Sequence, residues 1–464
     1  MQKEKTHITI IGSGIGGCFL ALELAKKGFH VDIYERISKE EVFDANSNRS
    51  YNLTFFSYGL NILRKAGLWE IIKPYLLPIK GSTTQIKKDS KPIFLPADPE
   101  KTEYFAISRA GLIQALVAEA EKNPLITMHF DTALLTIDRY AKTMTVQNTK
   151  TKALDTIACD VIFGADGVNS TVRPFVQQGQ DSSHTQEYAE WSYKQIVISK
   201  ELMDKMKLED RTVHSWTRKN AFIISIPNAD GSLSALLILP KNKYGYQSLK
   251  TPAAIKNLIE ENFPVLLPAL SDITKFLLEN PESNFVMIHT NPWYYKDFLA
   301  LIGDSAHGFY PFYGQGTSAA FGDAIQLIKL IDKYGTDWGK IFPLYQDARK
   351  RHMDALGEVS KEGFRTYRRH KKADYETIYV TLEMLAYNMF PKLFPPPLHE
   401  PVKNDPESTD DHVKQYAKQR KIARWLGIPL AVGGVTALVA MHEETTNAIK
   451  RLYLFFTKGS KRNS

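Results

Sequence analysis

The chain has 464 residues, of which 43% are hydrophobic and 24% are charged. These fractions are those of ordinary globular proteins, so they exclude a wholly disordered chain and a collagen-like or other fibrous chain. The formal net charge is +8, and residues 412–464 carry all of this excess, because the first 411 residues hold 49 charges of each sign. A nucleic-acid partner for the main body is therefore not expected.

The chain contains only two cysteines, Cys18 and Cys159. Two thiols cannot form a disulfide framework, and neither belongs to a pattern with metal-ligand spacing. The first seven residues are polar and contain no apolar core of a secretory signal. We therefore expect a reducing compartment, that is, a cytoplasmic location, and no metal site.

The N-terminal region predicts a β-strand, a helix and a second β-strand in succession. Ile8–Ile11 is a β-branched run, residues 18–27 have helical periodicity, and Val31–Tyr34 is a second apolar run that ends at Glu35. This order is typical of a dinucleotide-binding unit, in which an acidic residue after the second strand accepts the ribose hydroxyls.

The turn between the first strand and the helix has the pattern Gly12-x-Gly14-x-x-Gly17, with Gly16 inside it. The first glycine allows a tight turn, the second allows the backbone to approach a pyrophosphate, and the third allows the helix to pack on the strand. The helix N-terminus then faces the phosphates. This pattern indicates a dinucleotide site but does not distinguish FAD from NAD.

Two further segments carry candidate site residues. Residues 159–173 predict a strand followed by a turn with Asp166 and Thr171, which is typical either of a cofactor loop or of a plain capped helix. Residues 299–316 predict a strand that ends at Asp304, then a glycine-rich turn before a helix. A carboxylate there can accept a ribitol hydroxyl, and the helix N-terminus can stabilise negative charge on a reduced flavin.

Residues 185–290 contain short alternating apolar runs that predict an antiparallel sheet, which we expect the segment 76–105 to join. We expect His307 to be a packing residue. The predicted fold is α/β, a Rossmann-like FAD-binding domain with an inserted antiparallel substrate domain and a helical C-terminal part. The expected boundaries are 1–75, 106–180 and 291–335 for the FAD-binding domain, 76–105 and 181–290 for the substrate domain, 336–390 for the C-terminal helices, 391–411 for a proline-rich linker and 412–464 for a basic apolar tail.

Together and in this order, the three motifs resemble the FAD-binding set of the single-component flavin monooxygenases of the p-hydroxybenzoate hydroxylase type. Further stretches, among them Arg49–Leu53 and Pro311–Gly316, are similar to the kynurenine 3-monooxygenase branch of that family. The resemblance implies catalytic positions at Phe312 and Gln315. It implies, with the motifs above, cofactor contacts at Gly12, Gly14, Gly16, Gly17, Glu35, Arg36, Arg49, Arg109, Leu134, Asp166, Thr171, Asp304, Pro311, Gly314, Gly316, Thr317 and Ser318.

The chain also departs from this pattern. Thr317 and Ser318 stand where the family usually has Met-Asn, so the amide contact of that Asn is lost. Kynurenine hydroxylases bind the substrate carboxylate with an arginine and a nearby tyrosine, and our alignment places Ser82 and Ala97 there. Lys80 is close by but lacks the two-pronged geometry of a guanidinium. The identity of the aromatic substrate is therefore left open.

The resemblance implies an FAD-dependent enzyme that takes electrons from NADPH or NADH and hydroxylates a small aromatic substrate with O2, through a C4a-hydroperoxyflavin. A flavin reductase or dehydrogenase on the same fold, such as a prenyl-chain reductase, is an alternative. A membrane-associated scaffold that holds FAD without catalysis is another. No second glycine fingerprint indicates a separate nicotinamide domain.

The basic tail contains a run of 17 residues without a charge, Trp425–Met441. At about 1.5 Å per residue, a helix of this length is at the short limit for crossing a bilayer. Cations lie on both sides of the run. The tail is therefore interpreted either as a helix packed on the body or as an anchor at the cytoplasmic face of a membrane.

Overall fold

The computed structural model describes residues 6–43, 52–86, 88–97, 103–368 and 398–418. These residues fall into two compact units, and the first holds the described residues up to 368 together with 399–410. Residues 419–464 of the expected tail, with the apolar run Trp425–Met441, lie outside the described residues, as does Arg49.

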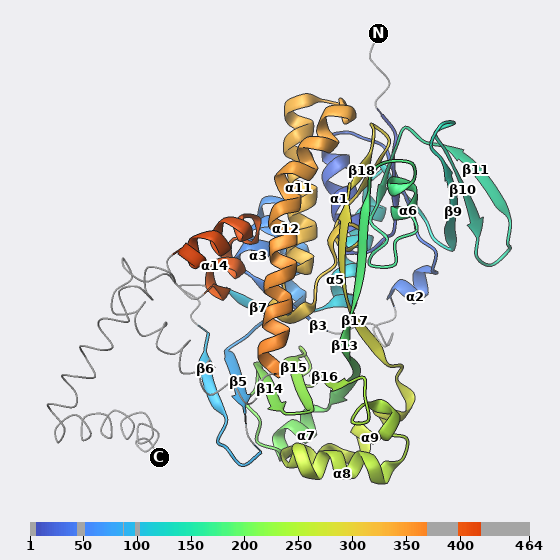
Figure 1. The fold of residues 1–464 in the computed structure, drawn as a ribbon. Coiled ribbons are helices and arrows are strands. Elements are labelled where there is room, and N and C mark those ends of the chain that lie inside the picture. Colours follow the sequence, from blue (N-terminus) through green and yellow to red (C-terminus); the bar gives the residue numbers. More distant parts are fainter. Residues whose placement is uncertain (1–5, 44–51, 87, 98–102, 369–397, 419–464) are drawn as a thin grey trace, which may run out of the picture. The chain divides into compact units, whose positions relative to one another are not determined.

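A six-stranded sheet forms the nucleotide-binding part of the unit (Figure 1). Its strands run parallel except for the first, and their order is β18 (Tyr294–Tyr295), β19 (Leu299–Leu301), β12 (Val161–Gly164), β1 (Ile8–Ile11), β2 (Val31–Tyr34) and β8 (Ile126–His129). The central strands are buried on both faces, which explains their continuous apolar sequences.

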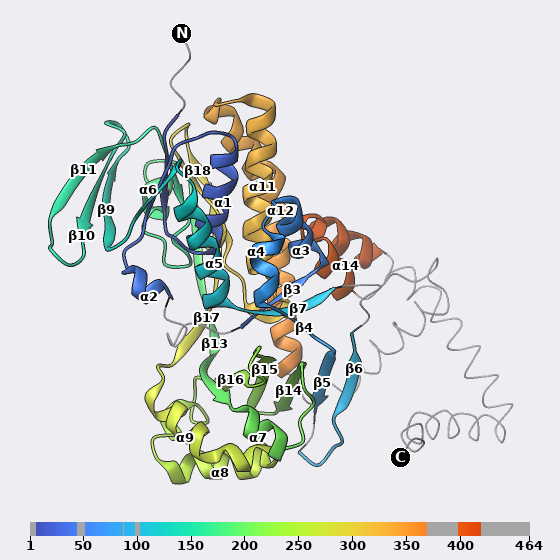
Figure 2. The same cartoon turned by 180° about the vertical axis from the view of Figure 1, so that it is seen from behind.

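Four long helices accompany this sheet: α1 (Ile15–Lys26), α5 (Arg109–Lys122), α11 (Gly316–Tyr334) and α12 (Trp338–Arg368). Helix α1 packs on α11, where the rings of Phe19 and Phe321 are 4.3 Å apart, centroid to centroid. Helix α11 in turn contacts α12, the orange helix in Figures 1 and 2. As expected from the sequence, α11 begins directly after the glycine-rich turn.

A seven-stranded sheet forms the second large part of the unit. Its order is β17 (Ser283–Asn291), β13 (Ser183–Ile198), β16 (Leu233–Pro240), β15 (Ala221–Pro227), β14 (Thr212–Arg218), β5 (Gly81–Gln85) and β6 (Ile93–Pro96). One face is covered by α7 (Lys200–Lys205), α8 (Pro252–Asn262), η3 (Pro264–Ala269) and α9 (Leu270–Glu279), as both views show (Figures 1 and 2). Ile223 and Leu237 pack against these helices, whereas their neighbours Ile224 and Leu236 face the other way.

The remaining strands form two three-stranded sheets. One has the order β3 (Asn52–Phe56), β7 (Tyr104–Ser108) and β4 (Leu76–Pro78), and the other has β11 (Leu154–Ala158), β10 (Thr143–Asn148) and β9 (Thr132–Asp138). The shorter helices are α2 (Lys39–Phe43), α3 (Ser57–Lys65), α4 (Trp69–Ile72), η1 (Lys73–Tyr75), α6 (Arg173–Gln177), η2 (Tyr246–Ser248), α10 (Asp304–His307), η4 (Pro311–Tyr313), α14 (His399–Asn404) and η5 (Pro406–Ser408).

The α/β class, the Rossmann-like sheet, the mainly antiparallel second sheet and the C-terminal helices are confirmed. Two details differ. Within 76–105 only β5 and β6 join the seven-stranded sheet, and β5 runs parallel to β14, while β7 pairs with β3 and with β4 in a separate sheet. The proposed linker 391–411 is wrong for residues 399–410, because they form a helix and a turn whose Val402 and Pro406 are buried. The domain boundaries themselves stay a proposal.

Among the described residues, no helix is both long and apolar enough to cross a membrane.

Candidate active site

The three sequence motifs meet at one cavity of about 540 Å³. The turn after β1, the loop after β12 and the loop after β19 each contribute to its wall. These strands are neighbours in one parallel sheet, so their carboxyl ends open at the same edge, where ligands of such sheets bind. The volume lies within the range of small-molecule sites.

The glycine turn places backbone rather than side chains at the cavity wall. Gly12 has a φ of +104°, and a Cβ there would lie 2.6 Å from the carbonyl oxygen of Ala165. A Cβ at Gly17 would lie 2.1 Å from the carbonyl oxygen of Gly12, so this position needs glycine for the packing of α1 on β1. No side chain caps the N-terminus of α1, where Gly14 is the N-cap. The first N–H groups of the helix are thus available to an anion.

Glu35 closes this turn at the end of β2. Its carboxylate accepts hydrogen bonds from the backbone N–H and the hydroxyl of Ser13, at 2.9 and 3.0 Å, and from the N–H of Ile37 at 3.2 Å. These bonds fix the carboxylate beside the helix N-terminus. Arg36, Arg109 and Leu134 also line the cavity, so cations and carboxylates border the same space.

The loop after β12 is ordered by Asp166. One carboxylate oxygen accepts from the N–H and hydroxyl of Thr171, at 2.6 and 2.8 Å, and from the N–H of Val172 at 3.2 Å. The other oxygen is buried, and no described residue bonds to it. The capped-turn interpretation of this segment is therefore correct as local structure, and the loop also lines the cavity.

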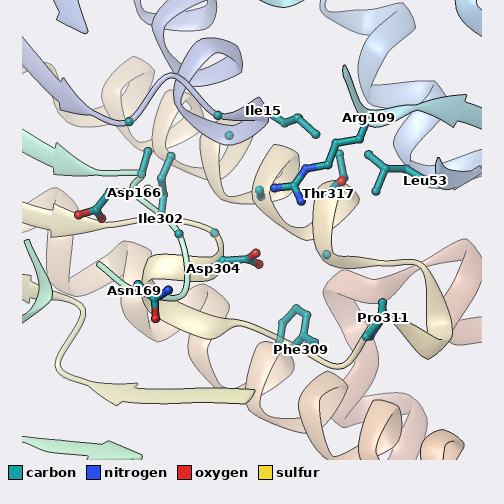
Figure 3. A pocket seen from close by; sticks show the side chains of 18 of the residues that line it. Ile15, Leu53, Arg109, Asp166, Asn169, Ile302, Asp304, Phe309, Pro311 and Thr317 are labelled. Atoms are coloured by element: carbon teal, nitrogen blue, oxygen red, sulfur yellow. The ribbon is translucent and has the colours of Figure 1, made fainter. Parts of the chain in front are cut away.

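Asp304 and Arg109 project into the same space (Figure 3). The Asp304 carboxyl is open to the cavity but lies deep among protein atoms. This desolvation raises its pKa, although the positive charge of Arg109 opposes the rise. A group that donates hydrogen bonds to the carboxylate, such as a sugar or ribitol hydroxyl, would replace the lost hydration.

A buried charge network supports the Asp304 loop from behind. The Asp323 carboxylate accepts from the N–H of Gly303 at 2.9 Å and lies 2.6 Å from His307 Nε2 and 2.8 Å from Arg349 Nε. Burial alone would raise the pKa of Asp323, but His307 and Arg349 lower it to about 2. His307 is 2% exposed and bound within the network, which confirms a packing residue.

The network continues into the C-terminal segment, where Arg349 Nη1 lies 3.0 Å from Glu407 Oε1. Gly322 makes this approach possible, because a Cβ there would lie 2.9 Å from Arg349 Nη2 and 3.1 Å from Glu407 Oε1. Gln315 Nε2 also donates to the carbonyl of Lys403, at 3.3 Å. Residues 399–410 are thus bonded both to the support of the Asp304 loop and to the cavity wall.

The other end of the cavity is apolar. Ile224 and Ile226 of β15, Leu236 of β16 and Phe285 of β17 line it together with Phe312. The Phe312 ring packs on those of Phe285 and Phe364, with centroids 5.1 and 4.8 Å apart. Between the two ends runs the segment Pro311–Thr317, which contributes Gln315 and the N-terminus of α11. Nearly all the predicted residues therefore lie in one place.

Two of the predicted residues that the structure describes, Gly17 and Ser318, do not line the cavity. Gly17 lies behind the turn, as its packing role requires, and Ser318 is 1% exposed and faces Gly59. Arg49 cannot be placed. The cofactor roles of all these residues remain predictions.

Several lining residues were not predicted from the sequence. Most lie on the substrate sheet or flank the motifs: Tyr34, Asn52, Thr54, Thr132, Asn169, Ile224, Ile226, Leu236, Phe285, Phe309, Tyr310 and Ser360. Asn52 belongs to a stretch that carried the resemblance, which was a usable signal. The apolar residues on the sheet gave none, because each strand is buried on both faces.

The residues present fit FAD. Uncapped helix N–H groups with Arg36 and Arg109 suit a pyrophosphate, the carboxylates of Glu35 and Asp304 suit hydroxyls, and the unpaired oxygen of Asp166 needs a donor. The apolar end beyond the Pro311–Thr317 segment leaves room for a further ring.

Comparison with known proteins gives the same cofactor. Residues 5–358 match the sequence model of a family described as FAD binding domain. Kynurenine 3-monooxygenase of Salinispora arenicola (strain CNS-205) is 30% identical over 447 residues, which cover 95% of this chain and 98% of that protein. The enzyme of the same name from Christiangramia forsetii is 32% identical over 366 residues, 78% of this chain and 81% of that protein.

Solved structures show the same fold at low identity. The tetrameric form of 2-methyl-3-hydroxypyridine-5-carboxylic acid oxygenase matches with a TM-score of 0.66 and 18% identity, over 87% of this chain and 98% of that chain. Klebsiella pneumoniae HpxO complexed with FAD and uric acid also gives 0.66, at 17% identity, over 81% of this chain and 92% of that chain.

Proposed function

The chain belongs to the FAD-dependent monooxygenase family, and on that premise we propose that it uses NAD(P)H and O2 to hydroxylate an aromatic ring, by a reaction of the kynurenine 3-monooxygenase type. In the balanced reaction, an aromatic C–H, O2, NAD(P)H and a proton give the phenol, NAD(P)⁺ and water. The observation that carries the proposal is a single cavity with a charged end suited to FAD and an apolar aromatic end beside it.

Bound FAD would supply the redox chemistry, by taking a hydride from the nicotinamide and passing the electrons to O2. The chain's own residues bind, orient and exclude water. Arg36 and Arg109 would hold the pyrophosphate, while Glu35 and Asp304 would hold hydroxyls at two separate points, which fixes the orientation of a long cofactor.

The segment from Pro311 to Thr317 would govern the reacting end. The N-cap of α11, Gln315, makes no capping bond with its side chain, so the first N–H groups of this helix can stabilise negative charge that develops on a nearby ring. Phe312 and the apolar residues of the substrate sheet would exclude water from the reacting atoms. Exclusion of water prevents the oxidising equivalents from being lost as hydrogen peroxide.

The experiment is NADPH and NADH oxidation by FAD-loaded protein, with and without a panel of amino- and hydroxy-substituted aromatic compounds that includes L-kynurenine. We expect at least one compound to accelerate oxidation and to gain one oxygen atom, which is detected by mass with ¹⁸O2. Acceleration with hydrogen peroxide as the only oxygen product for every compound would contradict hydroxylation. Electron transfer to a compound without oxygen incorporation would indicate a reductase instead.

A further inference from the structure

The substrate end of the cavity specifies the chemical class of the ring. We infer, on the basis of the proposed function, that the substrate is an uncharged aromatic compound without the carboxylate of an amino acid. The juxtaposition that carries this is an apolar aromatic compartment near which three described cations, Lys80, Lys361 and Arg218, have partners outside the cavity.

The charged residues of the described cavity wall all come from outside the seven-stranded sheet. They are Glu35, Arg36, Arg109, Asp166 and Asp304, which come from the three cofactor motifs and from the start of α5. The seven-stranded sheet contributes no charged side chain to the described wall. A bound anion at the sheet end would therefore face no described counter-charge.

The cations closest in sequence to this end are engaged outside it. Lys80, just before β5, pairs with Asp210 at 3.3 Å, and its side chain is 49% exposed. Lys361, beside the cavity residue Ser360, pairs with Glu187 at 2.6 Å. Neither lysine lines the cavity.

Arg218, on β14 of the same sheet, is also engaged elsewhere. It donates to the carbonyl of Asn262 at 2.6 Å and to Gln85 at 2.6 and 2.9 Å. These bonds hold the guanidinium at the end of β5, so it is not available to a substrate carboxylate.

Phe285 and Phe312 line the compartment, and Phe222 and Phe364 pack behind them. Phe312 contacts the rings of Phe222, Phe285 and Phe364 at centroid distances of 6.0, 5.1 and 4.8 Å. Phe222, Phe285 and Phe364 are at most 3% exposed. Such a wall attracts the faces and edges of another ring, and it desolvates whatever enters.

Desolvation without a counter-ion disfavours a carboxylate much more than a neutral polar group. Neutral substituents do have partners here, since the Ser360 hydroxyl and the Gln315 side chain belong to the wall. The Gln315 side-chain oxygen has no hydrogen-bond partner among the described residues. The compartment therefore fits a ring with amino, hydroxyl or carbonyl substituents.

The test measures ligand binding to the oxidised, FAD-loaded full chain by the change in flavin absorbance, with no NAD(P)H present. The probes share one aminated ring: 2-aminoacetophenone is uncharged, anthranilate carries a carboxylate, and L-kynurenine carries an amino acid. We expect the Kd of 2-aminoacetophenone to be at least tenfold lower than the Kd of either charged probe.

A matched pair of variants tests the cause. Leu236→Arg places a cation on the cavity face of β16, and Leu236→Met keeps that face apolar. We expect Leu236→Arg to bring the Kd of anthranilate to or below that of 2-aminoacetophenone, and Leu236→Met to keep the wild-type order. The FAD content reports folding, and Ile224→Lys, on the neighbouring strand, replaces Leu236→Arg if that variant loses FAD.

Two results would overturn the inference. The first is that the wild type binds anthranilate or L-kynurenine more tightly than 2-aminoacetophenone. The second is that Leu236→Arg and Ile224→Lys retain FAD and still show the wild-type order of affinities. Either outcome leaves the proposed function intact if a charged ring is hydroxylated. Conversely, the protein could bind 2-aminoacetophenone tightly and yet hydroxylate none of the compounds. This result would refute the proposed function but would leave the inference about the ligand class standing.

Discussion

At the scale of single residues, Gly12 and Gly14 belong to one turn but differ in their surroundings. A Cβ at Gly12 would meet the Ala165 carbonyl at 2.6 Å with φ at +104°, whereas a Cβ at Gly14 would have its nearest neighbour at 4.0 Å. The first position is thus constrained by the protein itself, and the second only by what approaches from the cavity.

We expect Gly12→Ala to lower the free energy of unfolding of the FAD-free protein by about 1–3 kcal/mol, because the backbone there is strained for an L-residue. Urea unfolding measures this. Gly14→Ala is the control: it should keep the stability of the FAD-free protein and weaken FAD binding, measured by flavin fluorescence. Equal destabilisation by both substitutions would contradict this division.

Asp323 is the second residue whose surroundings determine its role. We expect Asp323→Asn to destabilise the protein by about 3–5 kcal/mol at neutral pH, since the buried Arg349 then loses its fully buried counter-ion and keeps only the partly exposed Glu407. The control is Glu103→Gln, which breaks the Arg64–Glu103 pair, whose two side chains are each 33% exposed. That loss should be below about 1 kcal/mol, and a similar loss in both variants would refute the argument.

The same carboxylate predicts a pH dependence. Its pKa is about 2 in the folded protein against an ordinary value of 3.8. A lowered pKa contributes stability that is present above pH 3.8 and is lost as pH falls toward 2. The contribution of this carboxylate to the unfolding free energy is about 2 kcal/mol. Between pH 3.8 and pH 2 the unfolding free energy of Asp323→Asn should therefore fall by about 2 kcal/mol less than that of the wild type.

At the scale of elements, α14 and η5 link the C-terminal part of the unit to the cavity. Val402 is fully buried, and the carbonyl of the next residue accepts the bond from Gln315. Glu407 reaches the buried Arg349. Packing of this short segment and the position of the cavity wall are therefore coupled through two independent contacts.

We expect Val402→Ala to cost about 1–2 kcal/mol of unfolding free energy and to weaken FAD binding as well, because Gln315 loses a fixed partner. Urea unfolding and an FAD titration measure the two effects. Leu154→Ala is the control, since Leu154 is 63% exposed on β11, and it should change neither. An unchanged FAD affinity in Val402→Ala would show that the segment is not coupled to the site.

At the scale of the whole molecule, FAD should act as a stabilising ligand, because the unfolded chain has no cavity to bind it. FAD at 100 times its Kd should raise the unfolding free energy by about 2.7 kcal/mol. In Arg109→Leu the rise at the same FAD concentration should be smaller. Arg64→Leu removes an arginine paired with Glu103 and should keep the full rise, so a reduced rise in both variants would argue against a role of Arg109 in binding FAD.

Local sequence determined the dinucleotide-binding half of this protein. The run Ile8–Ile11, the glycine turn and Glu35 are encoded within a short stretch, since strand propensity, positive φ and helix termini depend on neighbouring residues. The three motifs, combined with the family resemblance, therefore predicted the sheet, the cofactor and every charged residue of the described cavity wall.

Only the tertiary structure decided which residues line the substrate end of the cavity. Ile223 and Ile224 are adjacent and equally apolar, and only packing against α8 and α9 on one side decides which of them faces the cavity. The parallel pairing of β5 with β14 and the docking of residues 399–410 likewise join segments distant in the chain. Alternation places neighbouring side chains on opposite faces of a strand, but when both faces are buried, long-range packing determines which face meets the ligand.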